Sequence, residues 1–224
     1  MLKLEKSKFI IGTGISGLSA ACYGLKNKKK IKIFEGASHS GGRCRSYHDK
    51  TLDLEVDNGN HLILSANKNF LNFCKLIDSF NTLAFYESKF YFFDFQDKSR
   101  WSVEINDSFF PYWIFNKKKR IPKSALKDYF EILKILFARP DQSVYELLGG
   151  KSILFKTFWE PLTLGIMNSD CTNASAFLLS SVIKKSFLKG GKFCSIYQPK
   201  ISWDNTLIKP SINYIKKKGC SINY

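Results

Sequence analysis

The sequence of 224 residues predicts an α/β fold organised around a strand–turn–helix–strand unit near its N-terminus. Three observations predict this unit. The apolar residues 9–11 are long enough for one buried strand, and Gly12, Gly14 and Gly17 follow them in the spacing G-x-G-x-x-G. A second strand then ends at Glu35, 23 positions after Gly12. Together they indicate a dinucleotide-binding unit rather than a glycine-rich turn in an unrelated α/β protein.

The helix of this unit is predicted over residues 15–26. Small and apolar residues recur there at helical spacing, at Leu18, Ala21, Cys22 and Leu25. Asn27 suits the left-handed position after a helix, and the lysines that follow suit the negative end of its dipole. The second strand is expected at 31–34.

The glycine turn has the residues needed to bind a pyrophosphate. Gly12 permits the tight turn, Gly14 lets the backbone approach the phosphates, and Gly17 lets the helix pack closely on the strand. Ile15 and Ser16 begin the helix, whose unpaired N–H groups favour an anion. We therefore expect all five residues to contact a dinucleotide.

The segment after the second strand predicts a second phosphate-binding loop. Glu35 is placed to accept hydrogen bonds from the adenosine ribose, and an acid there disfavours the 2′-phosphate of NADP. Gly36 opens the segment GASHSGGRCRS. Its Gly41 and Gly42 allow close backbone approach, and Arg43 can bind two pyrophosphate oxygens. An ordinary polar loop would not need this order of residues.

The composition excludes several classes of protein. The net charge of +16 would be compatible with a nucleic-acid-binding protein. Only five of the 35 basic residues are Arg, however, and Arg is the residue preferred for nucleic-acid recognition, so no nucleic-acid partner is expected. The six cysteines are scattered, without metal-ligand spacing, and predict reduced thiols and no metal site. No stretch resembles a signal peptide or a membrane-spanning helix. A cytoplasmic protein is expected, with peripheral contact on the inner membrane face as an option.

These motifs resemble a known family. A glutamate followed by S-G-G-R-x-x-S is similar to the FAD-dependent amine-oxidase and phytoene-desaturase superfamily, which implies FAD as the cofactor. The segment Asp57–Leu64, D-N-G-N-H-L-I-L, resembles the squalene-associated desaturases, also called hydroxysqualene dehydroxylases. That family usually has Gln at the position of Asn60. The resemblance implies that Asn58, Gly59, Asn60 and His61 lie beside the flavin.

His61 is the one catalytic candidate. It can bond to flavin or substrate or transfer a proton, but a His held by backbone groups beside the cofactor is the preferred interpretation. A later block, W-E-P-L at 159–162 with Asn168 and A-S-A at 174–176, also resembles the family. It makes Trp159 and Asn168 candidate substrate-pocket residues, whose structural alternatives are core packing and a helix cap.

The middle of the chain carries less information. We expect a helix over residues 125–137, capped by Ser124, and aromatic strands between 83 and 101. The stretch Phe109–Arg120 places five aromatics before four cations, which is typical of an interfacial membrane contact. The alternative is a buried strand followed by a solvated turn. Near the C-terminus we expect a helix at 207–218 and a strand at 221–224.

The resemblance implies a domain plan and an activity. Residues 1–64 are expected to form the first part of an FAD-binding domain, 65–203 an inserted α+β substrate domain, and 204–224 the start of the return to the FAD-binding domain. Relatives continue beyond this point, so the chain is expected to be C-terminally truncated. The implied activity is reductive dehydroxylation of hydroxysqualene to squalene, an apolar isoprenoid, with an unknown electron donor.

Two alternatives remain open. A carotenoid-type desaturase or an amine oxidase would share every nucleotide motif. A chain of this length could also be a non-catalytic remnant that binds flavin or lipid.

Overall fold

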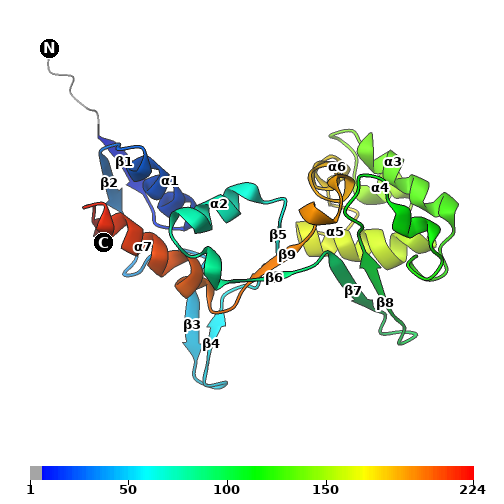
Figure 1. The fold of residues 1–224 in the computed structure, drawn as a ribbon, viewed down its shortest axis with the longest axis horizontal. Coiled ribbons are helices and arrows are strands. Elements are labelled where there is room, and N and C mark those ends of the chain that lie inside the picture. Colours follow the sequence, from blue (N-terminus) through cyan, green and yellow to red (C-terminus); the bar gives the residue numbers. More distant parts are fainter. Residues whose placement is uncertain (1–6) are drawn as a thin grey trace, which may run out of the picture. The chain divides into compact units, whose positions relative to one another are not determined.

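The computed structural model describes residues 7–224, and these fold into two compact units (Figure 1). Unit 1 contains the residues up to Ile63, Asn67–Phe85 and Tyr197–Tyr224; unit 2 contains Leu64–Ala66 and Tyr86–Ile196. Each unit has its own hydrophobic core.

The predicted strand–turn–helix–strand unit is present in unit 1. Strand β1 (Lys8–Ile11) leads into helix α1 (Ile15–Lys26) and strand β2 (Ile31–Phe34). Strands β1 and β2 pair in parallel, and β10 (Ile222–Asn223) pairs in parallel with the other edge of β2, which gives the order β1-β2-β10. A chain segment that is distant in sequence therefore completes this sheet.

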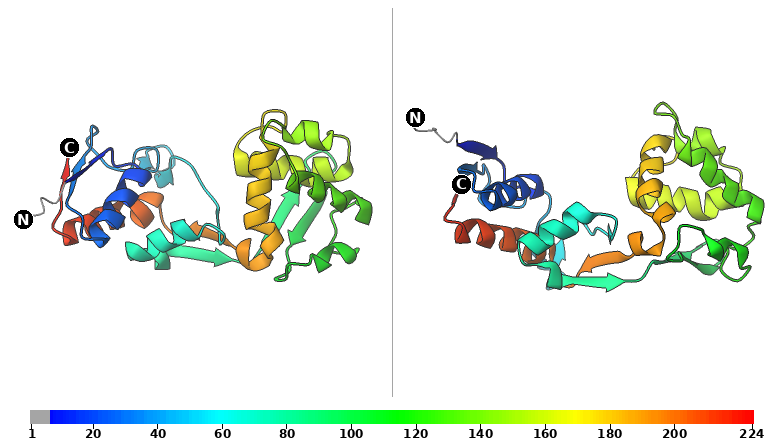
Figure 2. Two further views of the ribbon diagram at one scale, coloured as in Figure 1. Left: turned by 90° about the horizontal axis from the view of Figure 1, so that it is seen from above. Right: turned by 45° about the horizontal axis from the view of Figure 1, so that its top comes forward.

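Only one face of this sheet is covered within the described residues. Ile31 and Ile33 of β2 pack with α1 and α7 (Lys209–Lys217) in the core of unit 1, and Figures 1 and 2 show these two helices side by side. On the other face, Phe9 is 63% exposed and stacks on the exposed Phe34, with ring centroids 6.3 Å apart. The predicted strand over 9–11 is present and Ile10 packs against the core, but burial is wrong for Phe9 and Ile11, because nothing in the described chain packs on that face.

Unit 1 also contains an antiparallel hairpin, part of a second sheet and one more α-helix. The hairpin joins β3 (Ser46–Asp49) to β4 (Leu54–Asp57). A three-stranded sheet has the order β5-β9-β6, formed by β5 (Ile63–Leu64), β9 (Ile196–Pro199) and β6 (Leu83–Tyr86). Helix α2 (Lys68–Leu76) precedes β6, with the short 3-10 turn η1 (Phe80–Thr82) between them.

The limits of unit 2 differ from those of the predicted inserted domain. The sequence predicts that domain over 65–203, whereas residues 67–85 and 197–203 group with unit 1 in the structure. The physical reason is the buried face of α2, where Leu71, Phe73 and Cys74 pack into the same core as α1.

Unit 2 combines a hairpin with short helices. Strands β7 (Lys89–Phe93) and β8 (Arg100–Glu104) pair antiparallel, and Phe92 stacks on Trp101 with ring centroids 5.5 Å apart. The α-helices are α3 (Glu131–Leu136), α4 (Val144–Leu148), α5 (Glu160–Met167) and α6 (Ala176–Lys185). Among the described residues there are two π-helical turns, η4 (Phe155–Trp159) before α5 and η7 (Asp204–Ile208) before α7, the second of them in unit 1. The short 3-10 elements of unit 2 are η2 (Tyr112–Phe115), η3 (Leu126–Phe130), η5 (Phe187–Lys189) and η6 (Gly191–Phe193).

Two predicted helices differ from the observed ones. The helix predicted over 125–137 is a 3-10 segment, η3, followed by α3, and Ser124 does not cap it. The Ser124 hydroxyl instead donates to the Ile121 carbonyl at 2.6 Å and lies 3.0 Å from the Tyr129 hydroxyl. The helix predicted over 207–218 is the π-turn η7 followed by α7, with Pro210 in the first turn of α7.

Candidate functional site

The glycine turn of unit 1 requires glycine at two of its three positions. Gly12 has φ +87°, a conformation that L side chains rarely adopt. A Cβ atom on Gly17 would lie 1.9 Å from the Gly12 carbonyl oxygen, so any side chain there would force α1 away from the turn. Gly14 is different, since its φ of −61° is ordinary and a Cβ would meet nothing within 4 Å. Gly14 is therefore dispensable for the fold and faces open space.

The start of α1 offers its amides to an anion. Gly14 is the N-cap residue and supplies no side-chain cap, and no acidic residue occupies the first turn. The first amides of an α-helix have no intrahelical acceptor, and the dipole makes this end positive. A phosphate group beside Gly14 would accept hydrogen bonds from these amides, and its negative charge would be stabilised by the positive helix end.

The second glycine loop lies directly against the first. Gly41 forms a bridge with Gly14, and its amide donates to the Thr13 carbonyl at 2.9 Å. A Cβ on Gly42 would lie 3.3 Å from the Gly14 Cα. Both Gly41 (φ +116°) and Gly42 (φ +58°) need positive φ. Two phosphate-binding loops predicted separately from the sequence therefore meet at Gly14.

Glu35 is held in place by the turn that it follows. One carboxylate oxygen accepts from the Thr13 amide at 2.6 Å and from the Thr13 hydroxyl, and the other accepts from the Ala37 amide at 2.9 Å. The Thr13 hydroxyl, followed by the backbone amides, lowers the pKa of Glu35 to about 2. The carboxylate is ionised at neutral pH, and its remaining lone pairs can accept from a ribose.

A cavity of about 870 Å³ opens beside these loops. The predicted residues of the first turn that line it are Gly12, Gly14, Ile15, Ser16 and Gly17. The later predicted residues that line it are Gly41, Arg43, Asn58, Gly59 and His61. Glu35, Gly36, Gly42 and Asn60 are not among the lining residues.

Asn58 links the hairpin to the second glycine loop. Its side-chain amide donates to the Arg43 carbonyl at 3.1 Å, and its backbone amide donates to the Arg45 carbonyl at 2.9 Å. His61 is exposed at the cavity, where its Nε2 would lie 3.5 Å from a Cβ on Gly59. The guanidinium of Arg45, which also lines the cavity, lies 3.1 Å from His39 Nε2.

Sequence reasoning missed residues that come from distant parts of the chain. Trp203, Leu207 and Phe70 line the cavity, and Trp203 is 3% exposed. Asp57 fixes Trp203, because its Oδ1 accepts from the Trp203 amide at 2.9 Å and from the Ser46 hydroxyl. The Trp203 indole N–H has no protein partner among the described residues. No local spacing in the sequence signals these contacts.

Cys44 also lines the cavity as a neutral thiol. Burial, and then the nearby Asp57 and Asp204 carboxylates, raise the pKa of Cys44. A raised thiol pKa means little thiolate at neutral pH, so Cys44 offers an apolar surface rather than a nucleophile.

The chemistry of this cavity fits a dinucleotide. Open space at Gly14, the amides of α1 and the adjoining Arg43 suit a pyrophosphate, and the Glu35 carboxylate suits a ribose. The orphaned Trp203 N–H, which is costly to bury without an acceptor, suits a polar atom of a bound group. The residues of unit 1 therefore fit the cofactor that the sequence predicts.

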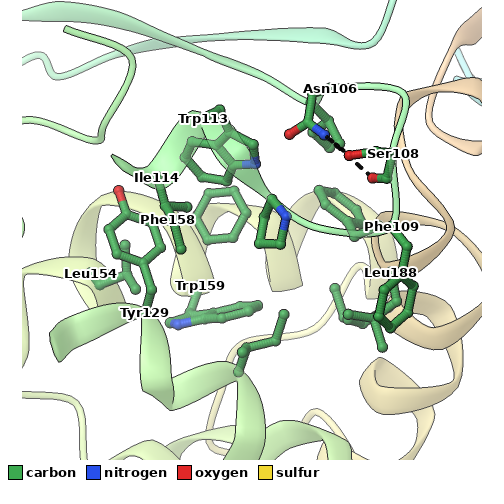
Figure 3. A pocket seen from close by; sticks show the side chains of 15 residues that line it. Asn106, Ser108, Phe109, Trp113, Ile114, Tyr129, Leu154, Phe158, Trp159 and Leu188 are labelled. Atoms are coloured by element: carbon green, nitrogen blue, oxygen red, sulfur yellow. Dashed lines mark hydrogen bonds between the residues drawn. The ribbon is translucent and has the colours of Figure 1, made fainter. Parts of the chain in front are cut away.

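A second cavity lies within unit 2 (Figure 3). It has a volume of about 110 Å³ and is lined mainly by aromatic and aliphatic side chains, among them Trp113, Ile114, Tyr129, Phe158 and Trp159. The candidate residue Trp159 is thus part of an apolar pocket. Asn168 lines neither cavity; it ends α5 in a left-handed conformation, with φ 50°, and its amide donates to the Leu164 carbonyl at 2.9 Å.

Residues 7–224 contain no group of three His, Cys, Asp or Glu side chains placed to hold a metal ion. In the same range, no helix combines the length and apolar character needed to cross a bilayer.

Comparisons with known proteins agree with this geometry. Residues 10–76 match the family model described as an NAD(P)-binding Rossmann-like domain. The chain is 33% identical over 219 residues to hydroxysqualene dehydroxylase of Zymomonas mobilis, covering 96% of this chain and 52% of that protein. It is 32% identical over 220 residues to hydroxysqualene dehydroxylase of Sinorhizobium fredii, covering 98% and 53%. The chain thus spans about half the length of these relatives.

Solved structures share the fold. An oxidoreductase from Methanosarcina mazei matches with a TM-score of 0.66 at 14% identity, over 97% of this chain and 51% of that one. Wild-type putrescine oxidase bound to putrescine matches with a TM-score of 0.58 at 15% identity, over 97% and 51%. The predicted resemblance is confirmed: along nearly its whole length this chain is similar to hydroxysqualene dehydroxylases, and it shares the fold of solved oxidoreductases such as putrescine oxidase.

Proposed function

We propose that this chain belongs to an FAD-dependent oxidoreductase that reductively removes the hydroxyl of hydroxysqualene to give squalene. The observation that carries the proposal is the similarity to hydroxysqualene dehydroxylases along nearly the whole chain. The cavity of unit 1 supports the cofactor, because Gly14, Gly41 and Arg43 line it and Glu35 is bonded to the adjoining Thr13, which together give the chemistry of a dinucleotide site.

Each part of FAD has a proposed partner. The pyrophosphate would bind at Gly14 and the first amides of α1, with Arg43 on its oxygens. The ribose hydroxyls would donate to Glu35. Asn58, Gly59 and His61 would lie beside the flavin ring, and Trp203 would donate its indole N–H to the cofactor. When bound in its reduced form, FAD supplies the hydride that replaces the hydroxyl, which leaves as water; an external donor must then reduce the flavin again.

The first experiment is a visible absorption spectrum of the purified chain, before and after addition of FAD. A flavin spectrum that stays with the protein through gel filtration supports the cofactor proposal. The decisive variant is Gly14→Ala, because its Cβ enters the open space meant for phosphate without clashing with the protein. We expect it to fold and to lose FAD binding by at least about tenfold.

The matched control is Gly165→Ala in α5. This glycine also has open space around its Cβ position, and it lies in unit 2. The substitution should leave FAD binding unchanged. Equal FAD affinity in wild-type protein and Gly14→Ala would contradict the proposed pyrophosphate position.

The activity is tested by product analysis with chemically reduced FAD. Conversion of hydroxysqualene to squalene supports the dehydroxylase. In a parallel assay with oxidised FAD, oxidation of phytoene or of an amine instead supports the desaturase or amine-oxidase alternative. The similarity with protoporphyrinogen oxidase of Dictyostelium discoideum, 33% over 206 residues, lends this alternative weak support. Flavin binding without turnover of any of these substrates supports a non-catalytic binding protein.

We propose further that unit 2 contacts an anionic membrane surface through Phe110, Tyr112 and Phe115, here called the aromatic cluster. These three rings are 48%, 63% and 54% exposed, and they pack on one another. The lysines 117–119 follow directly and are exposed. The alternative of a buried strand is wrong for this stretch, since residues 112–115 form the 3-10 turn η2, in which Tyr112 and Phe115 are exposed.

Vesicle co-sedimentation tests this contact. We expect binding to vesicles with anionic lipid, weak binding to neutral vesicles, and loss of binding with increasing salt. Replacing the three rings of the aromatic cluster with serine should abolish it. Phe137→Ser is the control, because Phe137 is 83% exposed in the same unit but lies outside the cluster. Equal losses in both variants would contradict a specific contact.

A further inference from the structure

Thr13 lies between the first two glycines of the turn, at a position to which the spacing G-x-G-x-x-G assigns no role. It is fully buried, and it is not among the residues that line the cavity of unit 1. Each of its polar groups is nevertheless used. The amide and the hydroxyl both donate to Glu35, and the carbonyl accepts from the Gly41 amide at 2.9 Å. Thr13 therefore joins the first turn, the end of β2 and the second glycine loop.

These hydrogen bonds make the two oxygens of the Glu35 carboxylate different. Oε2 accepts from the Thr13 amide at 2.6 Å and from the Thr13 hydroxyl. Oε1 accepts from the Ala37 amide at 2.9 Å. A carboxylate oxygen has about two lone-pair positions, so Oε2 is filled by Thr13 and Oε1 keeps a position for a further donor. A hydroxyl group of a ligand fits that position.

The same bonds keep the Glu35 carboxylate ionised. The Thr13 hydroxyl is the largest cause of the low pKa of Glu35, ahead of the Ala37 and Thr13 amides. Charged or titratable side chains on the elements that adjoin Glu35 belong to Lys32, His39, Arg43, Cys44, Arg45 and Tyr224. None of these six is among the causes of the low pKa. Hydrogen bonds within the chain, and chiefly those of Thr13, therefore set the charge of Glu35.

We propose that Thr13 is a positioning residue, whose hydroxyl fixes the Glu35 carboxylate so that Oε1 selects a ribose 2′-hydroxyl. A 2′-deoxyribose offers no donor to Oε1, and a 2′-phosphate would meet a like charge. The ribose is that of the proposed FAD, so the selectivity rests on the proposed function. The positioning does not, because its bonds lie within the chain.

Three variants separate positioning from packing. Thr13→Val keeps the branched shape of the side chain and removes the hydroxyl, and Thr13→Ser keeps a hydroxyl. Thr206→Val is the matched control, because Thr206 is also fully buried in unit 1 and does not line the cavity, but its hydroxyl bonds to Thr82 at 3.3 Å. We expect all three variants to fold, which circular dichroism checks.

Calorimetric titration of the full chain with ADP and 2′-deoxyADP measures the selectivity, since these probes differ only in the 2′-hydroxyl. Wild type, Thr13→Ser and Thr206→Val should prefer ADP about tenfold, the effect of one hydrogen bond to a charged group. Thr13→Val should prefer it no more than about threefold. A wild-type chain that binds neither probe, or binds both equally, overturns the proposal without any mutation. An equal preference in wild type and Thr13→Val, or an equal loss in Thr206→Val, also overturns it.

A second measurement needs no ligand. The carboxyl signals of carbon-13-labelled glutamates are followed by NMR from about pH 7 down to the onset of unfolding, and Glu35→Gln assigns the signal of Glu35. Loss of the Thr13 hydroxyl raises the pKa of Glu35 toward its ordinary value of about 4.3. The signal should therefore shift below about pH 5 in Thr13→Val and stay constant down to about pH 3.5 in wild type and Thr13→Ser. The same titration in wild type and Thr13→Val overturns the positioning role.

FAD binding is measured on the same preparations. ADP selectivity and a Thr13-dependent titration without FAD binding refute the proposed flavin and leave the role of Thr13 assigned. FAD binding with neither effect refutes the role of Thr13 alone. The two proposals therefore fail separately.

Discussion

The two cavities differ in what builds them. The cavity of unit 1 is shaped mainly by backbone, at glycines that either need positive φ or leave open space. The cavity of unit 2 is shaped by side chains such as Trp113, Phe158 and Leu188, which come from separate segments of the chain. A backbone-built site depends on residue spacing and a side-chain-built site depends on tertiary packing, so the first can be found in a sequence and the second cannot.

The cavities also share one feature. Each is lined by a deeply buried tryptophan whose indole N–H is unpaired, and each of these tryptophans adjoins a π-turn: Trp203 precedes η7 and Trp159 ends η4. Both indole N–H groups are therefore buried without a protein acceptor. The comparison predicts that variants of unit 1 change FAD binding and that variants of unit 2 leave it unchanged.

The largest expected effect is that of Gly17→Ala. Its Cβ would lie 1.9 Å from the Gly12 carbonyl oxygen, so α1 must move off the sheet. We expect a loss of unfolding free energy of about 4 kcal/mol or more, together with loss of FAD binding. Thermal unfolding followed by circular dichroism measures it. A melting temperature equal to that of the wild type would contradict the close packing of α1 on the turn.

A smaller effect, on both the cofactor and stability, is expected from Glu35→Gln. Gln turns a donor NH₂ toward the Thr13 or Ala37 amides, which now donate to carboxylate oxygens. We expect FAD affinity to fall by about tenfold and the melting temperature to fall as well, because these protein hydrogen bonds are weakened. A titration with FAD and a thermal melt of one preparation measure the two effects.

The pH dependence sharpens this prediction. The pKa of Glu35 is lowered to about 2, from an ordinary value of about 4.3. Its contribution to stability is therefore fully present above about pH 4.3 and is lost as the pH falls through about 2. The difference in FAD affinity between wild type and Glu35→Gln should be constant between about pH 5 and pH 8. A difference that disappears toward pH 5 would show that Glu35 protonates in that range.

Trp203→Phe probes the feature that the two cavities share. The indole N–H is lost, but no protein hydrogen bond is broken. We expect FAD affinity to fall about fivefold, with the melting temperature unchanged or slightly higher, because an unpaired buried donor has been removed. Fluorescence titration with FAD and a thermal melt measure the two quantities. Unchanged FAD affinity would show that the Trp203 N–H does not face the cofactor.

The contrast between a cavity built by backbone and one built by side chains explains how much the sequence could predict. The spacing of Gly12, Gly14 and Gly17 predicted β1, α1 and β2, and the second glycine loop was predicted from Gly41 to Arg43. The pairing of Gly41 with Gly14 and the contribution of Trp203 depend on tertiary folding, which brings residues far apart in sequence together. Local patterns cannot reveal either.

The wrong predictions also arise because local sequence does not determine tertiary packing. The residues 9–11 are apolar as a buried strand should be, but burial depends on what packs against them, and Phe9 and Ile11 are exposed in the described chain. Serine is a residue type that often caps a helix, but the Ser124 hydroxyl donates to the Ile121 carbonyl instead. In unit 2 the sequence marked Trp159 only by resemblance, and the cavity around it was not predicted.

The smallest expected effect concerns a side chain that closes the cavity of unit 2. The Tyr129 hydroxyl accepts from the Ile121 amide at 3.0 Å and lies 3.0 Å from the Ser124 hydroxyl, while its ring lines the cavity. Tyr129→Phe should lower the unfolding free energy by about 1 kcal/mol, because the amide loses its acceptor. Denaturant unfolding measures it. FAD affinity should not change, since Tyr129 lies in unit 2 and the glycine loops lie in unit 1. An unfolding free energy equal to that of the wild type would show that the bonds of the Tyr129 hydroxyl do not stabilise the fold.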